Sequence, residues 1–323
     1  MERIILIDEN MREIGDIDLD IDIEVGTTDA PNDFQITTSE LSRYDAKGFY
    51  IDGTEYGGFF EYNKSVTDSD IMVYKGFTWR GLMSKSLILP PDGSDYKTVS
   101  GEANSIISDI LSNVLDGFFT VPTESSGLTI TSYQFPLYID TMDGIEKMLE
   151  ANGYRLSIHA DKTADGVKVT AEAVEAVQIS GTYNNDSDVP MTFINDQMGI
   201  NHLLCAGQGE LQERMKVDLY LDENGEVSRT QYYTGFAERT AFYDYGSAES
   251  EDDLVDNGSK RLLELASHLS LSIDVPEEKD LEIGDIVQGT FPGGVVVRLP
   301  IVRKIFRVVN GIPSTQIKIK GDS

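Results

Sequence analysis

The feature that most restricts the fold is a run near the N-terminus in which acidic and aliphatic residues alternate without a break. The segment GDIDLDIDIEVG begins at Gly15 and places an aliphatic residue after each carboxylate. Successive side chains of a β-strand point to opposite faces, so this period of two predicts a strand with one buried face and one anionic face. The carboxylates on the predicted anionic face are Asp16, Asp18, Asp20, Asp22 and Glu24.

Like charges on one face of a strand must lie in water. Alternate residues of a strand are about 6.6–6.8 Å apart, which is less than the ~8–10 Å over which salt screens charges at ordinary ionic strength. Carboxylates at this spacing therefore repel one another. Two interpretations stay open: the charged face blunts edge-to-edge pairing of a sheet, or it forms a wall that does not hold a passing polyanion.

The hydrophobic period changes twice along the 323 residues, which predicts three domains. Residues 1–98 alternate as strands do, with turn signals, and end at the breaker-rich segment LPPDGSDYKTVSG. Residues 99–185 contain two helical stripes followed by a hairpin, and residues 186–323 return to strands with one helix. This arrangement predicts a mainly β fold with an inserted α/β domain.

Apolar stripes of period 3.6 predict three helices. The first is expected to end at a cap near Gly117, and the second to start after Asp140 or Thr141. The third has an acidic start at Glu249. The residues expected to be buried are Ile106, Ile107, Ile110, Leu111, Val114 and Leu115 in the first helix, Met142, Ile145, Met148 and Leu149 in the second, and Leu254, Val255, Leu262, Leu265 and Leu269 in the third.

The formal net charge of -30 and the pI near 4.3 restrict the partners of the chain. A field of this sign repels nucleic acids and anionic lipid surfaces, so ordinary nucleic-acid binding is not expected. No apolar run approaches the ~20 residues of a membrane helix. The four apolar residues after Arg3 are too few for a signal-peptide core of ~7–15 residues. We therefore expect no membrane segment and no secretion by the usual route.

Residues suited to catalysis or metal binding are few and scattered. Three histidines, His159, His202 and His268, fall on different predicted elements without a two-histidine zinc spacing. Cys205 is the only cysteine, which excludes an internal disulfide and fits a reducing cytoplasm. It stands three positions after His202 in a predicted strand, so the two side chains point to opposite faces and cannot form a thiolate–imidazolium pair. We predict no catalytic, cofactor or metal site.

Two further patterns suggest ligand-binding motifs but have simpler explanations. The Gly-x-Gly of residues 207–210 runs toward a strand rather than into a helix whose N-terminus could hold a phosphate, so a turn with positive φ explains both glycines. Asp222, Asn224 and Glu226 suggest a calcium loop, but no glutamate stands where the last ligand belongs. The Asn224–Gly225 dipeptide between alternating strands instead predicts a hairpin tip.

Long parts of the chain resemble the baseplate hub proteins at the tail tip of long-tailed phages and prophages. The segments that carry this resemblance are INHLLCAGQGELQERMKVDLYLDENGEV, DDLVDNGSKRLLELASHLSLSIDV, DLEIGDIVQGTFPGG and IVRKIFRVVNGIPSTQIKIKG, and TMDGIEKMLEANGYRLSI resembles the helix and strand of the family's inserted domain. The family motif is a strand reaching Gly-x-Gly-Glu and an arginine, followed by a helix and a Gly-Asp-x-Val strand. It falls here on Gly207, Gly209, Glu210, Arg214, Gly284, Asp285 and Val287.

The resemblance implies two tail-tube-like β-barrel domains per chain, the α/β insertion, and a homotrimer whose six barrels match the sixfold tail tube. It implies a virion structural protein that forms a ring at the distal end of the tube and contacts the distal tail ring protein, the tape-measure protein and tail-tip proteins. Such a protein is assembled in the host bacterial cytoplasm and lets DNA pass without binding it. The acidic strand would then line the channel, where cationic walls would stall DNA that carries a charge every ~1.7 Å of axis.

Two other functions stay open from the sequence. Many hub proteins continue into peptidoglycan hydrolases, whereas this chain stops about where the second barrel should end, so we expect no enzyme. A tail-associated hydrolase would show a pocket with converging carboxylates or a metal. A binder of host-surface carbohydrate or receptor would show aromatic residues gathered on an exposed face. Trp79 is the only tryptophan, but fifteen tyrosines could line a sugar site.

Overall fold

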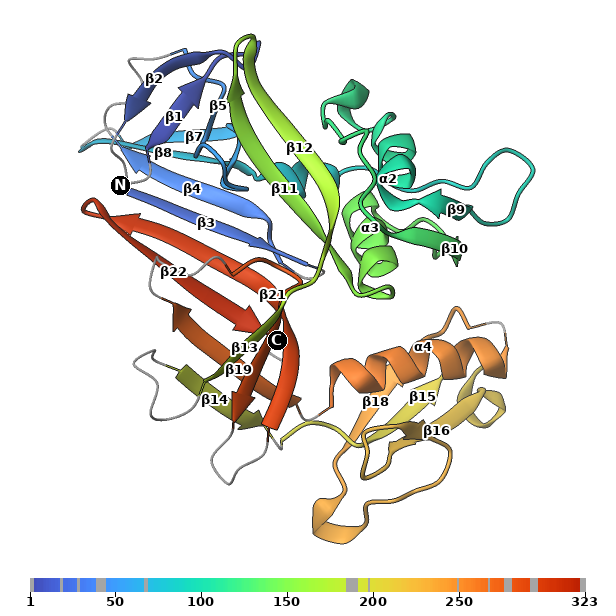
Figure 1. Ribbon diagram of the computed structural model, residues 1–323. Coiled ribbons are helices and arrows are strands. Elements are labelled where there is room, and N and C mark those ends of the chain that lie inside the picture. Colours follow the sequence, from blue (N-terminus) through green and yellow to red (C-terminus); the bar gives the residue numbers. More distant parts are fainter. Residues whose placement is uncertain are drawn as a thin grey trace. The chain divides into compact units, whose positions relative to one another are not determined.

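The computed structural model describes residues 3–17, 20–27, 30–38, 45–66, 69–183, 191–196, 198–248, 250–266, 268–275, 281–290 and 296–319 (Figure 1). Strands make up 45% of the chain and helices 18%, which confirms the prediction of a mainly β fold. Contacts between residues divide the chain into two compact units. The first unit contains Met1–Thr192 and Ser272–Lys320, and the second contains Phe193–Leu271.

The first unit is built around a large sheet in which strands from both ends of the chain lie side by side (Figure 1). β3 (Asp20–Gly26) pairs antiparallel with β4 (Asp33–Thr38) on one side and with β21 (Val296–Val309) on the other. The order continues from β21 to β22 and β19, and from β4 to β8 and β7. These strands span Ile312–Ile319 for β22, His268–Val275 for β19, Ser69–Phe77 for β8 and Tyr62–Val66 for β7.

A smaller sheet packs on the same core. Leu6 of β1 and Ile23 of β3 lie in one cluster of buried residues with Phe34 and Phe49, because the alternation of each strand turns its apolar side chains to one face. The rings of Phe34 and Phe49 pack edge to face with centroids 4.7 Å apart. The smaller sheet has the order β2, β1, β5, β6, with bounds Glu13–Ile17, Ile4–Ile7, Gly48–Tyr50 and Gly57–Phe59.

Two further strands extend the large sheet. β20 (Ile286–Thr290) pairs antiparallel with β21, and β13 (Gln178–Tyr183) pairs parallel with β20. Among the residues that the structure describes, the strand order has free ends and does not close into a ring. The two β-barrels implied by the resemblance therefore stay an expectation. β14 (Met191–Asp196) lies where the chain passes from the first unit to the second.

The segment between residues 99 and 185 contains the two helices that the change of period predicts. α2 (Ala103–Leu111) buries its predicted stripe up to Leu111. α3 (Thr141–Glu150) starts directly after Asp140, whose Oδ1 accepts a hydrogen bond from the backbone N–H of Asp143 at 2.9 Å. Its predicted stripe is buried. The helices lie beside the pair β9 and β10 (Figure 1), and the chain continues into a long hairpin of β11 and β12. These strands span Thr98–Glu102, Thr129–Gln134, Tyr154–Thr163 and Gly166–Glu175.

The end of α2 differs from the prediction. The helix stops at Leu111 rather than near Gly117, so the expected stripe is too long. Leu115 and Asp116 have positive φ values of 48° and 55° within a short 3-10 turn, and a right-handed α-helix cannot contain such residues. Leu115 is 47% exposed as a result.

The first hundred residues also contain one helix that the all-β prediction missed. α1 (Trp79–Met83) follows directly after β8 and has all five of its residues buried. Thr78 caps it, because its side-chain oxygen accepts a hydrogen bond from the backbone N–H of Gly81 at 3.3 Å. A single turn of helix has no detectable period, so only the capping residue marks it in the sequence.

The second unit is a four-stranded sheet with α4 (Glu251–Glu264) on one face. Ser250 caps this helix, and Leu254 and Leu262 are buried against the sheet as predicted. The predicted stripe is wrong at Leu269, which belongs to β19, because the helix ends at Glu264. The sheet has the order β17, β16, β15, β18, with bounds Val227–Ser228, Lys216–Leu221, His202–Ala206 and Thr240–Asp244.

The predicted domains at residues 1–98, 99–185 and 186–323 stay a prediction about folding units. In the structure, β21 of the last block pairs with β3 of the first block, over residues 303–308 and 21–26. Residues 193–271 form the separate second unit. The blocks of the sequence therefore mark changes of secondary structure along the chain, while the pairing of distant strands decides which residues pack together.

Gly76 of β8 offers a test of how closely the two sheets pack. A Cβ atom at this position would lie 1.8 Å from the Phe59 carbonyl oxygen. We expect Gly76→Ala to lower the free energy of unfolding by at least about 3 kcal/mol, the upper range for overpacking. Gly53→Ala is the control, since nothing lies within 4 Å of that Cβ and only its positive φ costs about 1–2 kcal/mol. Urea unfolding followed by Trp79 fluorescence measures both, and equal losses would contradict this packing.

Candidate functional site

The predicted acidic strand is two strands in two sheets. Asp16 lies in β2 of the smaller sheet, whereas Asp20, Asp22 and Glu24 lie in β3 of the large sheet. Asp18 lies outside the described residues. The prediction of one strand is wrong because β2 pairs with β1 while β3 pairs with β4 and β21. The alternation itself is confirmed in β3, where the aliphatic residues are buried and Asp20 and Asp22 are exposed.

The face expected to be entirely anionic carries arginines from the neighbouring strand. Arg307 of β21 stands directly opposite Asp22, and its Nε donates to Asp22 Oδ2 at 2.8 Å. Arg303 Nη1 lies 2.9 Å from Glu24 Oε1. The exposed pair of Arg307 and Asp22 contributes only about 0–1 kcal/mol, so its main effect is on the charge of the surface. The pair of Arg303 and Glu24 is half-buried. The face of β3 therefore has mixed charge.

The remaining described carboxylates of the predicted strand also have partners. The backbone N–H of Asn310 donates to Asp20 Oδ1 at 2.7 Å. On the smaller sheet, Arg3 Nε donates to Asp16 Oδ2 at 3.1 Å. The partners of Asp20, Asp22 and Glu24 lie about 280 residues further along the chain, so the local pattern could not indicate them.

A buried cluster of charged side chains links α1, α3 and the sheets, and the sequence analysis missed it. Arg80 of α1 is 2% exposed. Its Nε donates to Glu55 Oε2 at 2.7 Å, and its Nη1 donates to Glu146 of α3. Its Nη2 donates to the Leu156 carbonyl oxygen at 2.9 Å. One guanidinium therefore holds a loop, a helix and a strand together, which suits its planar set of donors.

Lys304 of β21 extends this cluster. Its Nζ lies 3.0 Å from Glu282 Oε2 and 4.0 Å from Glu55 Oε1. Three carboxylates, on Glu55, Glu146 and Glu282, thus face two cations. In the part of the chain that the structure describes, Glu55 Oε1 and Glu146 Oε2 are buried without a hydrogen-bond partner. An excess of buried acid favours the uptake of a proton.

The pKa shifts in the cluster follow from burial and charge. Burial raises the pKa of Glu146 to about 8, although Arg80 opposes this shift. Burial also raises the pKa of Glu282. Burial alone would lower the pKa of Lys304, but Tyr56 and the nearby carboxylates raise it. Lys304 therefore stays charged, and Glu146 binds a proton near neutral pH.

The predicted Gly-Asp-x-Val motif forms a buried junction in the first unit. Gly284 has a φ of +91°, and a Cβ there would lie 2.5 Å from Arg155 Cβ, so the position requires glycine. Asp285 Oδ1 accepts from Arg155 Nε at 2.9 Å and from the Val177 N–H at 3.0 Å. Val287 is buried. These contacts tie both ends of the β11–β12 hairpin to the start of β20, which is a structural role.

The predicted Gly-x-Gly-Glu segment forms a tight turn in the second unit. Gly209 has a φ of +105°, and its Cβ would lie 2.7 Å from the Glu213 carbonyl oxygen. Arg214 Nε donates to the Gly207 carbonyl oxygen at 2.8 Å, and its Nη2 contacts Asp244. Glu210 is exposed. Arg214 therefore holds the turn against β18. The expected turn is present, but the expected positive φ is found at Gly209 and not at Gly207.

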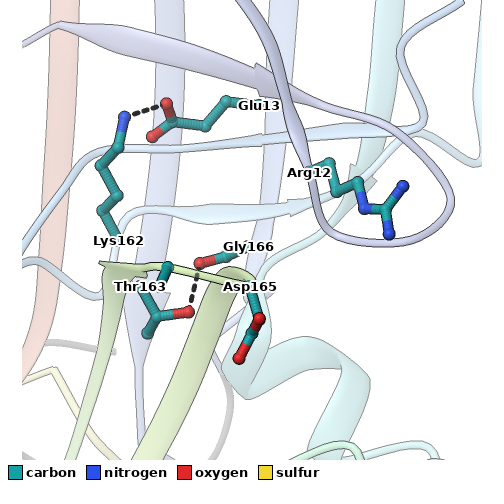
Figure 2. Close-up of a pocket in the computed structure, with 7 residues that line it drawn as sticks. Arg12, Glu13, Lys162, Thr163, Asp165 and Gly166 are labelled. Carbon is teal, nitrogen blue, oxygen red and sulfur yellow. Dashed lines mark hydrogen bonds and ion pairs between the residues drawn. The ribbon is translucent and has the colours of Figure 1, made fainter.

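A polar pocket of about 460 Å³ lies between the β1–β2 turn and the tip of the β11–β12 hairpin (Figure 2). Figure 2 shows Lys162 joined to Glu13, and the Thr163 hydroxyl donating to the Gly166 carbonyl oxygen. Arg12 and Asp165 complete the charged lining. The lining has two acids and two bases, and the acid Glu13 is neutralised by Lys162. The hydrogen bond from Lys162 lowers the pKa of Glu13, so this carboxylate stays ionised.

Cys205 and His202 lie on opposite faces of the sheet, as the sequence predicts. Cys205 is fully buried under α4, and burial raises the pKa of its thiol to about 11. His202 lies on the other face of the sheet, with Nε2 2.8 Å from Asp218 and Nδ1 2.8 Å from Glu238. Within the described ranges, no three His, Cys, Asp or Glu residues gather as a metal ion would require. No described helix is long and apolar enough to cross a membrane.

The fold of the whole chain is similar to that of solved phage tail proteins. No protein-family model and no curated protein matches the chain. The 43 kDa tail protein of prophage MuSo2 from Shewanella oneidensis superposes with a TM-score of 0.52 at 10% identity, over 98% of each chain. A tail protein from Neisseria meningitidis gives 0.48 at 10% identity over 99% of this chain and 96% of that one. Prophage tail protein gp18 from Listeria monocytogenes has a TM-score of 0.47 at 13% identity, over 100% of this chain and 96% of that one.

The comparison with the MuSo2 protein confirms the resemblance at the level of the fold. The superposition on the MuSo2 protein covers 98% of this chain, so it includes residues of both units. This chain therefore has the fold of a prophage tail protein. At 10% identity, individual residue roles do not carry over from the solved structure.

The buried cluster predicts a pH dependence of stability. The pKa of Glu146 is about 8 in the folded protein against 4.5 for the free group. Between these values the folded state keeps a proton that the unfolded state loses, so stability falls as the pH rises from about 4.5 to about 8. We expect Glu146→Gln to remove this part of the slope. Glu150→Gln, an exposed change on the same helix, should leave it, and equal slopes in all three proteins would contradict the assignment.

Arg80 should matter more than any one of its acidic partners. Arg80→Met leaves Glu55 buried without its cation and Glu146 without its hydrogen-bond donor, and we expect a loss of about 3–5 kcal/mol in the free energy of unfolding. Urea titrations at pH 7 measure the loss through the fluorescence of Trp79, which neighbours Arg80. A loss below about 1 kcal/mol, the range of an exposed pair, would show that the cluster does not hold the elements together.

Proposed function

We propose that this chain is a structural component of a phage tail, located in the tail tip or baseplate of the virion. The observation that carries the proposal is the similarity of fold to the MuSo2 tail protein over 98% of each chain. The first unit supports a structural role, because its charged residues are used to join its elements. We propose no enzymatic activity. Purified peptidoglycan should therefore stay intact with the protein, and lysis abolished by one carboxylate substitution would contradict this.

In more detail, we propose that three copies form a ring at the distal end of the tail tube. Each copy would contribute two tail-tube-like barrels, so that six barrels continue the sixfold tube. The ring would contact the distal tail ring protein, the tape-measure protein and tail-tip proteins, and would be assembled in the bacterial cytoplasm. The large sheet supports this proposal, since it brings strands from both ends of the chain together. Among the described residues its edges are free, so neighbouring copies can pair with them.

We further propose that Asp20, Asp22 and Glu24, the acidic residues of β3, face the axis of this ring. Asp16, from the same predicted run, lies in the smaller sheet, and Asp18 lies outside the described residues. DNA in transit would then meet a surface on which carboxylates neutralise the arginines of β21. The pairs formed by Arg303 and Arg307 support this version, because they limit the cations available to phosphates without building up the repulsion of an all-acidic wall.

Deletion of the gene from the phage or prophage that carries it tests the structural role. A tail component at the tip is needed for assembly or for its completion, so induced lysates should lack infectious particles and contain incomplete tails in electron micrographs. Supplying the intact gene in trans should restore both. Complete, infectious particles without the gene product would contradict the proposal.

Lysine substitutions test the channel wall separately. We expect the combined change of Asp20, Asp22 and Glu24 to lysine to lower DNA delivery more than the number of tails, because uncompensated cations bind passing phosphates. Tail counts by electron microscopy and ejected DNA measure the two effects.

The control is the pair Asp22→Lys with Arg307→Asp, which keeps the charge balance and the cross-strand contact. It should deliver DNA as the unmodified phage does. Triple-lysine particles that deliver DNA normally would contradict the placement on the axis and leave the structural role untouched.

A further inference from the structure

The second unit has an open sheet edge. α4 packs on β15, β16 and β17 and covers one face of the sheet. β18 lies at the end of the strand order, and within the described part of the chain it pairs only with β15. The five residues of β18 include no proline and form a regular parallel ladder without a bulge. Natural edge strands commonly carry a proline or a bulge that prevents pairing with another chain. β18 has neither of these two protections.

The backbone groups that point away from the sheet can be assigned from the ladder. The N–H of His202 donates to the Arg239 carbonyl oxygen at 3.1 Å, and the N–H of Tyr245 donates to the Ala206 carbonyl oxygen at 2.8 Å. The peptide groups of a strand alternate in direction, so the odd-numbered residues of β18 face β15. The N–H and carbonyl groups of Thr240, Phe242 and Asp244 therefore point outward.

The side chains along this edge favour pairing with another strand. Phe242, at the centre of β18, is 59% exposed, which is unusual for a phenylalanine in a strand. It stands opposite Leu204 on the sheet face that α4 does not cover. Asp244 is the only ionised group of the strand, and Arg214 neutralises it. The edge therefore presents an apolar centre and no net charge, although the whole chain is strongly acidic.

We propose that β18 pairs antiparallel with β18 of a second copy of this chain, centred on Phe242. In this register Phe242 stands opposite its own copy, and Thr240 stands opposite Asp244. All three outward residues of each strand then find partners, for about six hydrogen bonds between the copies. The two phenylalanine rings lie on the same face and cover one another. No like charges stand opposite each other.

A second copy suits this edge better than an unrelated strand because the sequence of β18 is self-complementary about its centre. The two-fold arrangement joins the two sheets into one continuous sheet of eight strands. A contact of one short strand per copy is small, so the association is expected to be weak and dependent on concentration. It uses the second unit alone and does not require the trimeric ring.

Sedimentation equilibrium of the full chain across a wide concentration range tests the pairing. Phe242→Lys places two cations opposite each other at the centre of the contact, and we expect it to weaken association at least about tenfold. Phe236→Lys is the control, because Phe236 is an exposed phenylalanine that lies outside β18, and it should change association by less than about twofold. Any trimer formed through the first unit would survive both changes.

Amide hydrogen exchange of the unmodified chain provides a second measurement that needs no variant. The amides of Thr240, Phe242 and Asp244 should exchange more slowly as the protein concentration rises, whereas Ala241 and Tyr243, already bonded to β15, should not change. The proposal is overturned if the unmodified chain stays monomeric at all concentrations, if Phe242→Lys associates as the unmodified chain does, or if the three outward amides exchange at a rate independent of concentration.

Discussion

The antiparallel pairing of β3 with β21 is the contact on which the first unit depends. It joins residues 21–26 to residues 303–308, so it closes a loop of nearly the whole chain, and that closure costs conformational entropy before any contact repays it. Contacts on both faces of the pair offset this entropy. Ile23 stands opposite Phe306 in the core, while Asp22 stands opposite Arg307 in water. Without this pairing the acidic strand would be an unprotected edge.

The buried charges build on the same contact. Lys304 lies on the core side of β21 and meets Glu55 and Glu282, and Glu55 in turn meets Arg80. A change in the register of β21 by one residue would place Lys304 on the solvent face and leave these acids buried without it. The charge cluster therefore fixes the register of β21 against its neighbours, which apolar contacts alone would fix less strictly. Burying these charges costs desolvation free energy. A purely apolar core would avoid that cost but would allow the strands to slide in register.

Local patterns in the sequence predicted local structure well. The alternation around Asp22 placed the buried face of β3 correctly, and the stripes ending at Leu111 and Leu149 located α2 and α3. Contacts between distant residues were not predictable in this way. The residues near Asp22 do not indicate that Arg307 will lie beside it. The residues near Arg80 likewise do not indicate that its guanidinium is the centre of a buried cluster. The predicted stripe of α4 extends wrongly to Leu269. The leucine at the start of β19 happens to fall at the helical spacing, so the pattern does not show where the helix ends.

The central claim is that the chain is built into the tip of a phage tail. Cryo-electron microscopy of tails from the phage that encodes it tests this claim most directly. The account predicts density for the two sheets of the first unit at the distal end of the tail tube, repeated around its axis, with β3 turned toward the channel. Complete tails in which this fold is missing from the tip would contradict it, whereas tails with β3 on the outside of the ring would contradict only the proposed channel wall.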